Sequence, residues 1–111
     1  MAALITYDSA PSTGKNKNVQ MIGNNLVLYT GTFDMNNTAT ATIDLTSTSN
    51  VPVAATNVRF AMVSVTEAVS ESCTWGWNID GSGSAAAGKL GITAVADQVN
   101  NTGIWFAICD I

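Results

Sequence analysis

The sequence predicts a single all-β domain, an antiparallel β-sandwich of about eight strands with a jelly-roll or an immunoglobulin-like arrangement. Short apolar segments of period two recur along its 111 residues, and no segment has the i, i+3, i+4 apolar spacing of an amphipathic helix. Thr, Val and Ile are common, whereas the strong helix formers Leu, Glu and Lys are scarce. Since 47% of the residues are hydrophobic, the chain can build one core and is not compositionally disordered.

The N-terminal part differs in pattern from the rest of the chain. We expect residues 1–17 to form an extended N-terminal arm and residues 18–111 to form the sandwich domain. The arm has a short apolar segment at 2–7, followed by a polar stretch that contains Pro11 and Gly14. An apolar end on a polar segment suits strand addition to a neighbour, so the arm is predicted to contact another molecule.

Turn-forming residues divide the sandwich domain into short strands. Strands are expected at 19–22, 26–33, 38–45, 57–66, 73–80, 90–95 and 103–111. The intervening segments are rich in Asn, Ser and Gly, which favour turns. The strand at 38–45 has the clearest alternation, with every second residue apolar. Such a strand buries one face and leaves the other in water, as in an antiparallel sheet.

Two of the expected strands are apolar on both faces. Simple alternation over 57–66 predicts one face made by Val58, Phe60 and Met62 and another made by Ala61, Val63 and Val65. The strand at 103–111 is apolar on both faces in the same way. Because both faces of the strand at 57–66 avoid water, we expect it to be central in a sheet or covered on two sides.

The charge content excludes several classes of function. Only 12 residues are charged, four Lys or Arg and eight Asp or Glu, and there is no His. Without His the chain has no Ser-His-Asp or Cys-His catalysis and no imidazole metal ligand. Its net charge of −4 gives no attraction to nucleic acid or to an anionic membrane. We therefore predict no enzyme, no metal, no cofactor, and neither nucleic acid nor membrane as a partner.

No metal-binding motif stands out in the sequence. Cys73 and Cys109 belong to no Cys-x-x-Cys pair, so we predict two buried thiols, with a disulfide between them as the alternative. The segment 80–83, Asp-Gly-Ser-Gly, resembles the start of a calcium loop but lacks its further acidic ligands. It is predicted to be a solvated hairpin tip.

Trp75 and Trp77 lie two residues apart and are predicted to share one face of a strand. Three interpretations remain open. The indoles could fill the core, they could anchor a subunit contact, or they could stack on sugar rings as a ligand platform.

Three segments carry a resemblance to a known group of proteins. Leu-Tyr-Thr-Gly-Thr-Phe-Asp at 28–34, the Thr-rich alternating strand at 38–45 and the Gly-Ile-Trp-Phe ending from Gly103 resemble the small β-rich virion proteins of tailed bacteriophages. Among these are the head decoration, or cement, proteins. The resemblance implies a structural protein on the capsid surface, assembled in the host cytoplasm. It further implies a homotrimer over a local three-fold position, with the major capsid protein or another virion protein as partner.

Composition favours the same kind of function. Buried subunit contacts are depleted in Lys, Glu and Asp, so a chain with so few charges suits extensive contact with other subunits. We expect the interface with subunits or capsid to include Leu4, Ile5, Tyr7, Trp75 and Trp77. The alternative is a carbohydrate-binding or adhesion module, associated with a tail or fibre, that uses exposed Trp residues.

Overall fold

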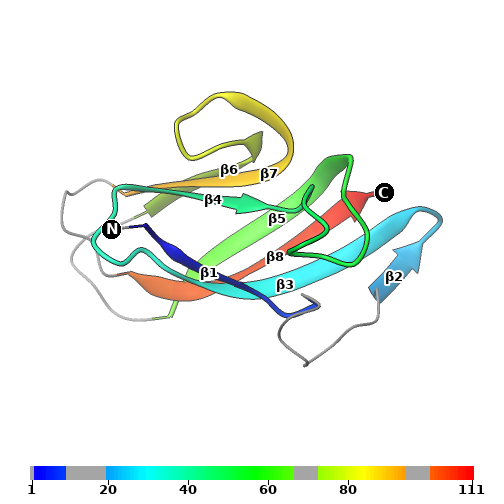
Figure 1. Ribbon diagram of the computed structural model, residues 1–111, viewed down its shortest axis with the longest axis horizontal. Helices are drawn as coiled ribbons and strands as arrows, with labels where there is room; N and C mark the ends of the chain where they lie inside the picture. The colour runs from blue at the N-terminus through cyan, green and yellow to red at the C-terminus, as the bar shows by residue number, and fades with distance from the viewer. Residues whose placement is uncertain (1, 10–19, 67–72, 95–100) are drawn as a thin grey trace.

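The structure, a computed structural model, describes residues 2–9, 20–66, 73–94 and 101–111. Over these residues the chain forms eight strands in two antiparallel sheets that pack as a sandwich (Figure 1), which confirms the predicted fold class. Within these ranges no helix is long and apolar enough to cross a membrane.

The larger sheet has five strands. Four of them follow the order β1-β3-β8-β5, and β2 pairs with β3 on the same edge as β1. Its strands are β1 (Leu4–Tyr7), β2 (Gln20–Gly23), β3 (Leu26–Asp34), β5 (Asn57–Val65) and β8 (Thr102–Asp110). The smaller sheet has the order β4-β7-β6 and consists of β4 (Thr40–Asp44), β6 (Cys73–Ile79) and β7 (Ala85–Ala94). The sequence leaves the strand order open. In the structure β8, the last strand of the chain, lies between β3 and β5.

The core lies between the two sheets. Large buried side chains come from β3 and β8 on one side and from β4 and β7 on the other: Val27, Tyr29, Trp105, Ile43, Leu90 and Ile92. Met35 and Leu45, just beyond the ends of β3 and β4, are also fully buried. Gly31 makes room for the indole of Trp105, because a Cβ at Gly31 would lie 2.5 Å from that ring and 2.0 Å from the carbonyl oxygen of Thr6. The Trp105 Nε1–H donates to the Thr32 carbonyl at 3.2 Å.

The alternation predicted for 38–45 is confirmed in β4. Ala41 and Ile43 are buried in the core, whereas Thr40 and Thr42 are exposed on the outer face of the smaller sheet. The strand expected at 90–95 begins earlier than predicted, at Ala85.

The faces predicted for 57–66 are wrong at one point, because β5 contains a bulge. The register with β8 shifts between Val58 and Phe60, so that Arg59 is the extra residue. Val58 therefore lies on the core face together with Ala61, and Phe60 and Met62 lie on the outer face. The prediction of a central or covered strand is also wrong for β5, since β5 is the last strand of its sheet.

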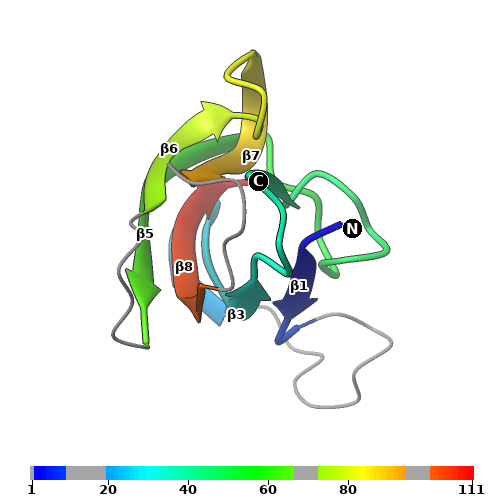
Figure 2. The same ribbon diagram turned by 90° about the vertical axis from the view of Figure 1, so that its left-hand side faces the viewer.

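Asn78 connects the edge of β5 to the smaller sheet. Its side-chain Oδ1 accepts a hydrogen bond from the Val58 N–H, and its Nδ2 donates to the Val58 carbonyl, both at 2.9 Å. The same Oδ1 accepts from the Gly88 N–H at 3.0 Å. Asn78 sits at a bulge in β6 with a φ of 57°, a left-handed conformation that Asn tolerates well. Figure 2 shows β5 and β6 side by side on this flank of the sandwich.

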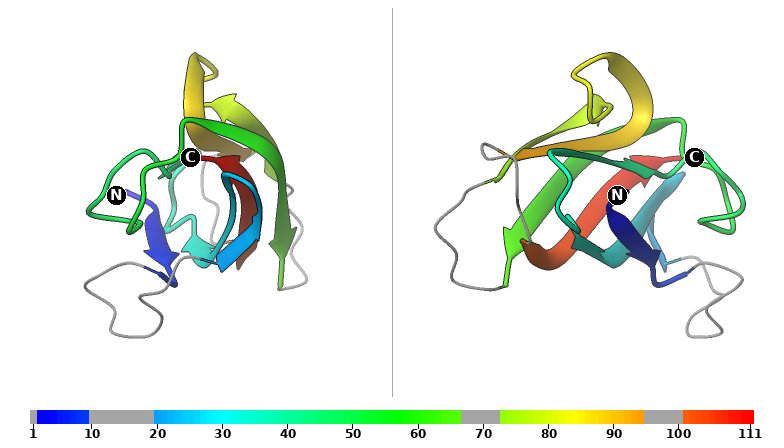
Figure 3. Two further views of the ribbon diagram at one scale, coloured as in Figure 1. Left: turned by 90° about the vertical axis from the view of Figure 1, so that its right-hand side faces the viewer. Right: turned by 60° about the vertical axis from the view of Figure 1, so that its left-hand side comes forward.

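The first part of the expected N-terminal arm lies in the larger sheet rather than apart from the domain. Residues Leu4–Tyr7 form β1, which pairs with β3 in antiparallel register. The Tyr7 ring packs edge-on against Trp105 with centroids 5.6 Å apart, and its hydroxyl accepts from the Asp44 N–H at 3.0 Å. Residues 10–17 of the expected arm lie outside the described residues. Figure 3 shows β1 on the flank opposite β5.

Candidate functional site

The outer face of the five-stranded sheet, which points away from the core, carries a continuous set of apolar side chains. We call it the outer apolar face, and its members are Ile22, Leu28, Phe60, Met62, Ile104, Phe106 and Ile108. Ile104 is 52% exposed, Met62 49% and Phe60 43%, although these are the residue types that folding normally buries. Exposed apolar side chains that form one patch mark a binding surface.

The strand register brings these side chains together in rows. Ile108 on β8 is opposite Leu28 on β3 and Phe60 on β5. Phe106 is opposite Met62 in the next row. Because cross-strand partners lie about 5 Å apart, three strands contribute to one contiguous surface with β8 along its middle.

Aromatic rings extend this surface to the smaller sheet. The Phe60 ring lies 6.0 Å from Phe106 and 5.7 Å from Trp77, measured between centroids. Trp77 in turn lies 6.0 Å from Trp75 at an interplanar angle of 34°. The two tryptophans are therefore the end of a four-ring cluster that crosses from β6 to β8.

A shallow groove runs along one side of β8 on the outer apolar face. It has a volume of about 450 Å³ and is lined by Ile22, Leu28, Thr30, Phe106 and Ile108. Four of these five side chains are hydrocarbon, and none carries a charge. The groove can therefore take up apolar groups, and none of its five lining side chains titrates between about pH 2 and 12.

Charged and hydroxyl groups surround the outer apolar face at its margins. Arg59 and Asp110 form an ion pair at one end of the sheet, with Arg59 Nε 3.2 Å from Asp110 Oδ1. On the β1 side, Asp8 accepts a hydrogen bond from the Thr30 hydroxyl at 2.8 Å. An apolar centre with a polar rim is the usual anatomy of a protein–protein interface.

The structure separates the residues predicted to form the interface. Trp75 is half-buried and packs against the core, whereas Trp77 is 39% exposed and touches Phe60. The register pairs them with Ile92 and Leu90, so both indoles lie on the core-bearing face of the smaller sheet, at its edge. The prediction that they share a face is confirmed. Of the two, Trp77 is the one that joins the outer apolar face.

The three predicted interface residues of β1 also divide. Ile5 and Tyr7 are half-buried and pack against the core, and burial raises the pKa of the Tyr7 hydroxyl. Ile5 lines a hollow of about 310 Å³ between β1 and β4. Leu4 is 57% exposed and is therefore available to a partner.

Sequence reasoning missed the centre of the site. It named none of Leu28, Phe60, Met62, Ile104, Phe106 and Ile108 as interface residues. The two-faced apolar pattern of 57–66 and 103–111, together with the low charge content, does favour contact with other subunits, but it does not show which face of each strand is core and which is interface. In the structure one face of each strand lies in the core, and the other is the outer apolar face.

The hairpin tip predicted at 80–83 is confirmed as a self-contained turn. Asp80 Oδ1 accepts hydrogen bonds from the Ser82 N–H at 2.9 Å, the Ser82 hydroxyl at 2.7 Å and the Ser84 N–H at 3.0 Å. These hydrogen bonds, the Ser82 hydroxyl first, hold the pKa of Asp80 below its usual value. The carboxylate is thus directed to its own loop.

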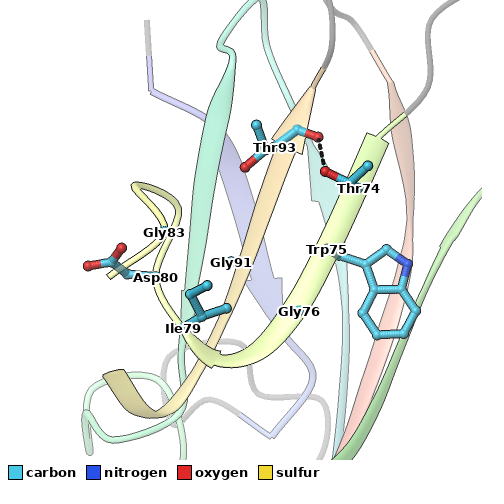
Figure 4. A pocket seen from close by; sticks show the side chains of 8 residues that line it. All are labelled: Thr74, Trp75, Gly76, Ile79, Asp80, Gly83, Gly91 and Thr93. Atoms are coloured by element: carbon cyan, nitrogen blue, oxygen red, sulfur yellow. Dashed lines mark hydrogen bonds between the residues drawn. The ribbon is translucent and has the colours of Figure 1, made fainter. Parts of the chain in front are cut away.

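A hollow of about 210 Å³ lies beside this tip, on the smaller sheet (Figure 4). Gly76 and Gly91 are paired across β6 and β7 and both line the hollow. The hairpin tip packs closely over Gly91, because a Cβ there would lie 2.2 Å from the Asp80 carbonyl oxygen. In Figure 4 the Asp80 side chain points away from the sheet. Over the described residues, no three His, Cys, Asp or Glu side chains group as metal ligands.

The two cysteines are both free thiols in the structure. Cys109 is buried, which confirms that half of the prediction, whereas Cys73 is only half-buried and accepts a hydrogen bond from Asn101 Nδ2 at 3.0 Å. Burial, assisted by the nearby Asp110 carboxylate, raises the pKa of Cys109 to about 12. A thiol of this kind is inert as a nucleophile at neutral pH.

No protein-family model, curated protein sequence or solved structure matches the chain.

Proposed function

We propose that this chain is a non-enzymatic structural protein of a tailed-bacteriophage virion, most consistent with a capsid decoration (cement) protein. The observation that carries the proposal is the outer apolar face, on which three strands present large apolar side chains to solvent around β8. A contiguous exposed apolar patch of this kind is typical of a surface that binds a partner.

The chemistry of the described residues supports a binding role rather than catalysis. The outer apolar face places hydrocarbon side chains at its centre and keeps the Arg59–Asp110 pair at its end. Such a surface gains free energy by removing apolar area from water, which is the main driving force of most protein association. In the proposed mechanism, binding across assembled subunits stabilises the assembled state by mass action.

The resemblance supports the virion context. The segments that carry it include parts of β3, β4 and β8, and β3 and β8 also build the outer apolar face. On this proposal the protein lies on the capsid surface, and its partners are copies of itself and the major capsid protein or another virion protein.

Immunogold labelling of intact particles tests the proposal. Antibodies raised against the purified chain are applied to particles released from cells that carry its gene, with pre-immune serum as the control. We expect labelled heads. Label confined to tails would move the protein to the tail, and particles without label would refute a virion role.

The competing function, a carbohydrate-binding or adhesion module, depends on Trp77. The aromatic rings that contact Trp77 are those of Phe60 and Trp75. A sugar-binding site also needs polar side chains that hydrogen-bond the hydroxyl groups of the sugar. A glycan array with the wild-type chain and Trp77→Ala decides this point. Binding that disappears in Trp77→Ala would favour the adhesion module over decoration.

A further inference from the structure

The outer apolar face has a raised side and a hollow side, separated by β8. On the β5 side, Phe60 and Met62 are each more than two-fifths exposed, and we call this pair the β5 ridge. On the β3 side lies the groove of about 450 Å³ that Leu28 and Ile108 line together with their neighbours. The strand order β3-β8-β5 places ridge and groove at either side of the same central strand.

This arrangement is complementary to itself. A rotation of 180° about an axis along β8, in the plane of the contact, turns two outer apolar faces toward each other. The same rotation places the β5 side of one copy opposite the β3 side of the other. Each β5 ridge then meets the groove of its partner, and the two contacts are identical, as in any isologous interface.

We infer that the outer apolar face binds a second copy of this chain in a two-fold dimer, with each β5 ridge in the partner's groove. The inference deepens the proposed function, because it names the partner of the same face, and it rests on the proposal that the chain is an assembly subunit. It replaces the trimer that the resemblance implies with a two-fold contact.

Charge favours a second copy over a charged partner. The chain carries a net charge of −4, so two copies repel each other wherever their carboxylates meet. The centre of the outer apolar face presents no charged side chain among the described residues, and Arg59 is paired with Asp110 at its end. Two copies can therefore meet through this face without bringing like charges together.

The size of the face suits a dimer. Side chains of this type expose roughly 200 Å² each when free. At the exposed fractions of Ile22, Phe60, Met62, Ile104 and Trp77, they alone present on the order of 500 Å². A stable interface buries about 800 Å² per partner, and the half-buried Leu28, Phe106 and Ile108 and the polar rim add to the area that the face presents.

Sedimentation velocity of the purified full chain from about 1 to 100 μM gives the first test. We expect a dimer that dissociates on dilution. Met62→Lys places a charge on the β5 ridge at a half-exposed position, and it should raise the dimer dissociation constant at least about tenfold. Val53→Lys is the matched control, since Val53 is 39% exposed outside this face, and it should remain dimeric.

A charge-complementation pair tests the two-fold geometry itself. Phe60 and Leu28 lie in the same row at either side of β8, so the axis brings Phe60 of one copy opposite Leu28 of the other. Phe60→Lys and Leu28→Glu should each be monomeric alone, and their mixture should form a one-to-one heterodimer. If Phe60→Lys loses its near-UV circular dichroism, Met62→Lys replaces it, because its row is about 7 Å away and within reach of a lysine.

Three sedimentation results would overturn the inference. The wild type could be a monomer at 100 μM, it could be a trimer, or folded Met62→Lys could remain as dimeric as the wild type. Folded Lys and Glu variants that stay monomeric when mixed would also overturn it. None of these results bears on particle labelling, so failure of the dimer and failure of the virion role are distinguishable.

Discussion

The Asn78 side chain hydrogen-bonds both backbone groups of Val58, accepting from the N–H and donating to the carbonyl at 2.9 Å each. A primary amide reproduces the donor and acceptor pattern of a peptide group, so Asn78 occupies the place of a neighbouring strand at this point of β5. Since β5 is the last strand of its sheet, this contact joins the two sheets at their β5–β6 flank. The remaining edge of β5 lies beside the aromatic cluster that contains Trp77 and Phe60.

We expect Asn78→Gly to lower the free energy of unfolding by about 2–3 kcal/mol, because it leaves partly buried backbone groups of Val58 without their partner. Glycine keeps the left-handed φ of 57° at no steric cost, and its effect on the unfolded chain is the same in Asn25→Gly, so the difference between the two variants reports the hydrogen bonds. Asn78→Ala should lose about 1 kcal/mol more through backbone strain. Urea denaturation measures both, and Asn25→Gly, at a left-handed φ of 58° in an exposed turn, is the control. Equal stability of Asn78→Gly and Asn25→Gly would contradict the bridging role.

Gly31→Ala should destabilise the protein by about 3 kcal/mol or more, because the added methyl group overlaps both the Thr6 carbonyl and the Trp105 ring. The indole cannot move away without leaving the core, so β1 should separate from β3 first. Urea unfolding followed by tryptophan fluorescence measures the loss. Gly23→Ala is the matched control, since its nearest contact would be an ordinary 3.5 Å from Leu26. A Gly31→Ala variant as stable as Gly23→Ala would show that the Trp105 site has spare room.

The raised pKa of Cys109 predicts a loss of stability in alkali. Folding raises this pKa from 9.0 to about 12, so the folded state holds its proton where the unfolded state releases it. The resulting contribution to stability is complete below pH 9 and is lost progressively as the pH rises toward 12. Guanidinium unfolding between pH 8 and 10 should show this decline, and Cys109→Ala should flatten it. Tyr7 and Tyr29, whose pKa values burial also raises, add to the decline only above pH 10.

Thiol labelling checks the same residue independently. With Ellman's reagent at pH 8, Cys109 should react only after the protein unfolds, because the buried thiol stays protonated. The Cys73→Ser variant isolates its signal. Fast labelling of native Cys73→Ser would mean that Cys109 is accessible.

Ser82→Ala should raise the pKa of Asp80 toward its usual value, because the Ser82 hydroxyl is the largest cause of the lowered pKa. A pH titration of the Asp80 carboxyl carbon by NMR measures the change. Ser49→Ala is the control, because Ser49 is exposed in the loop between β4 and β5. We expect it to leave the pKa of Asp80 unchanged. No difference between the two variants would indicate that the backbone N–H groups alone hold the carboxylate.

Alternation of apolar residues was sufficient to predict the all-β class and the buried face of β4, because period two is a direct consequence of the pleat. It did not show that Leu4–Tyr7 pairs in the larger sheet or that β7 begins at Ala85. It failed within β5, where the bulge at Arg59 moves Val58 to the face of Ala61. A bulge of this kind depends on the neighbouring strand and on Asn78, a residue twenty positions away, so local pattern does not reveal it.

The candidate site was harder to predict for a related reason. A strand that is apolar on both faces, such as 103–111, has the same pattern whether its second face is covered within the chain or by another molecule. Only the strand order shows that no layer of the described chain packs over Ile104 and Phe106. Trp77 was identified from its residue type, whereas Phe60 and Met62 needed the register.

The position of β8 has a consequence for the time course of folding. Strands β3 and β5 share no hydrogen-bonded ladder with each other, and β5 is joined to β3 only through β8, which follows both in the chain. The ladder between Leu26 and Asp110 closes a loop of more than eighty residues. Pairing residues so far apart in the chain costs conformational entropy before the new contacts stabilise the sheet. We therefore expect slow folding, with the pairing of β8 as the rate-limiting step.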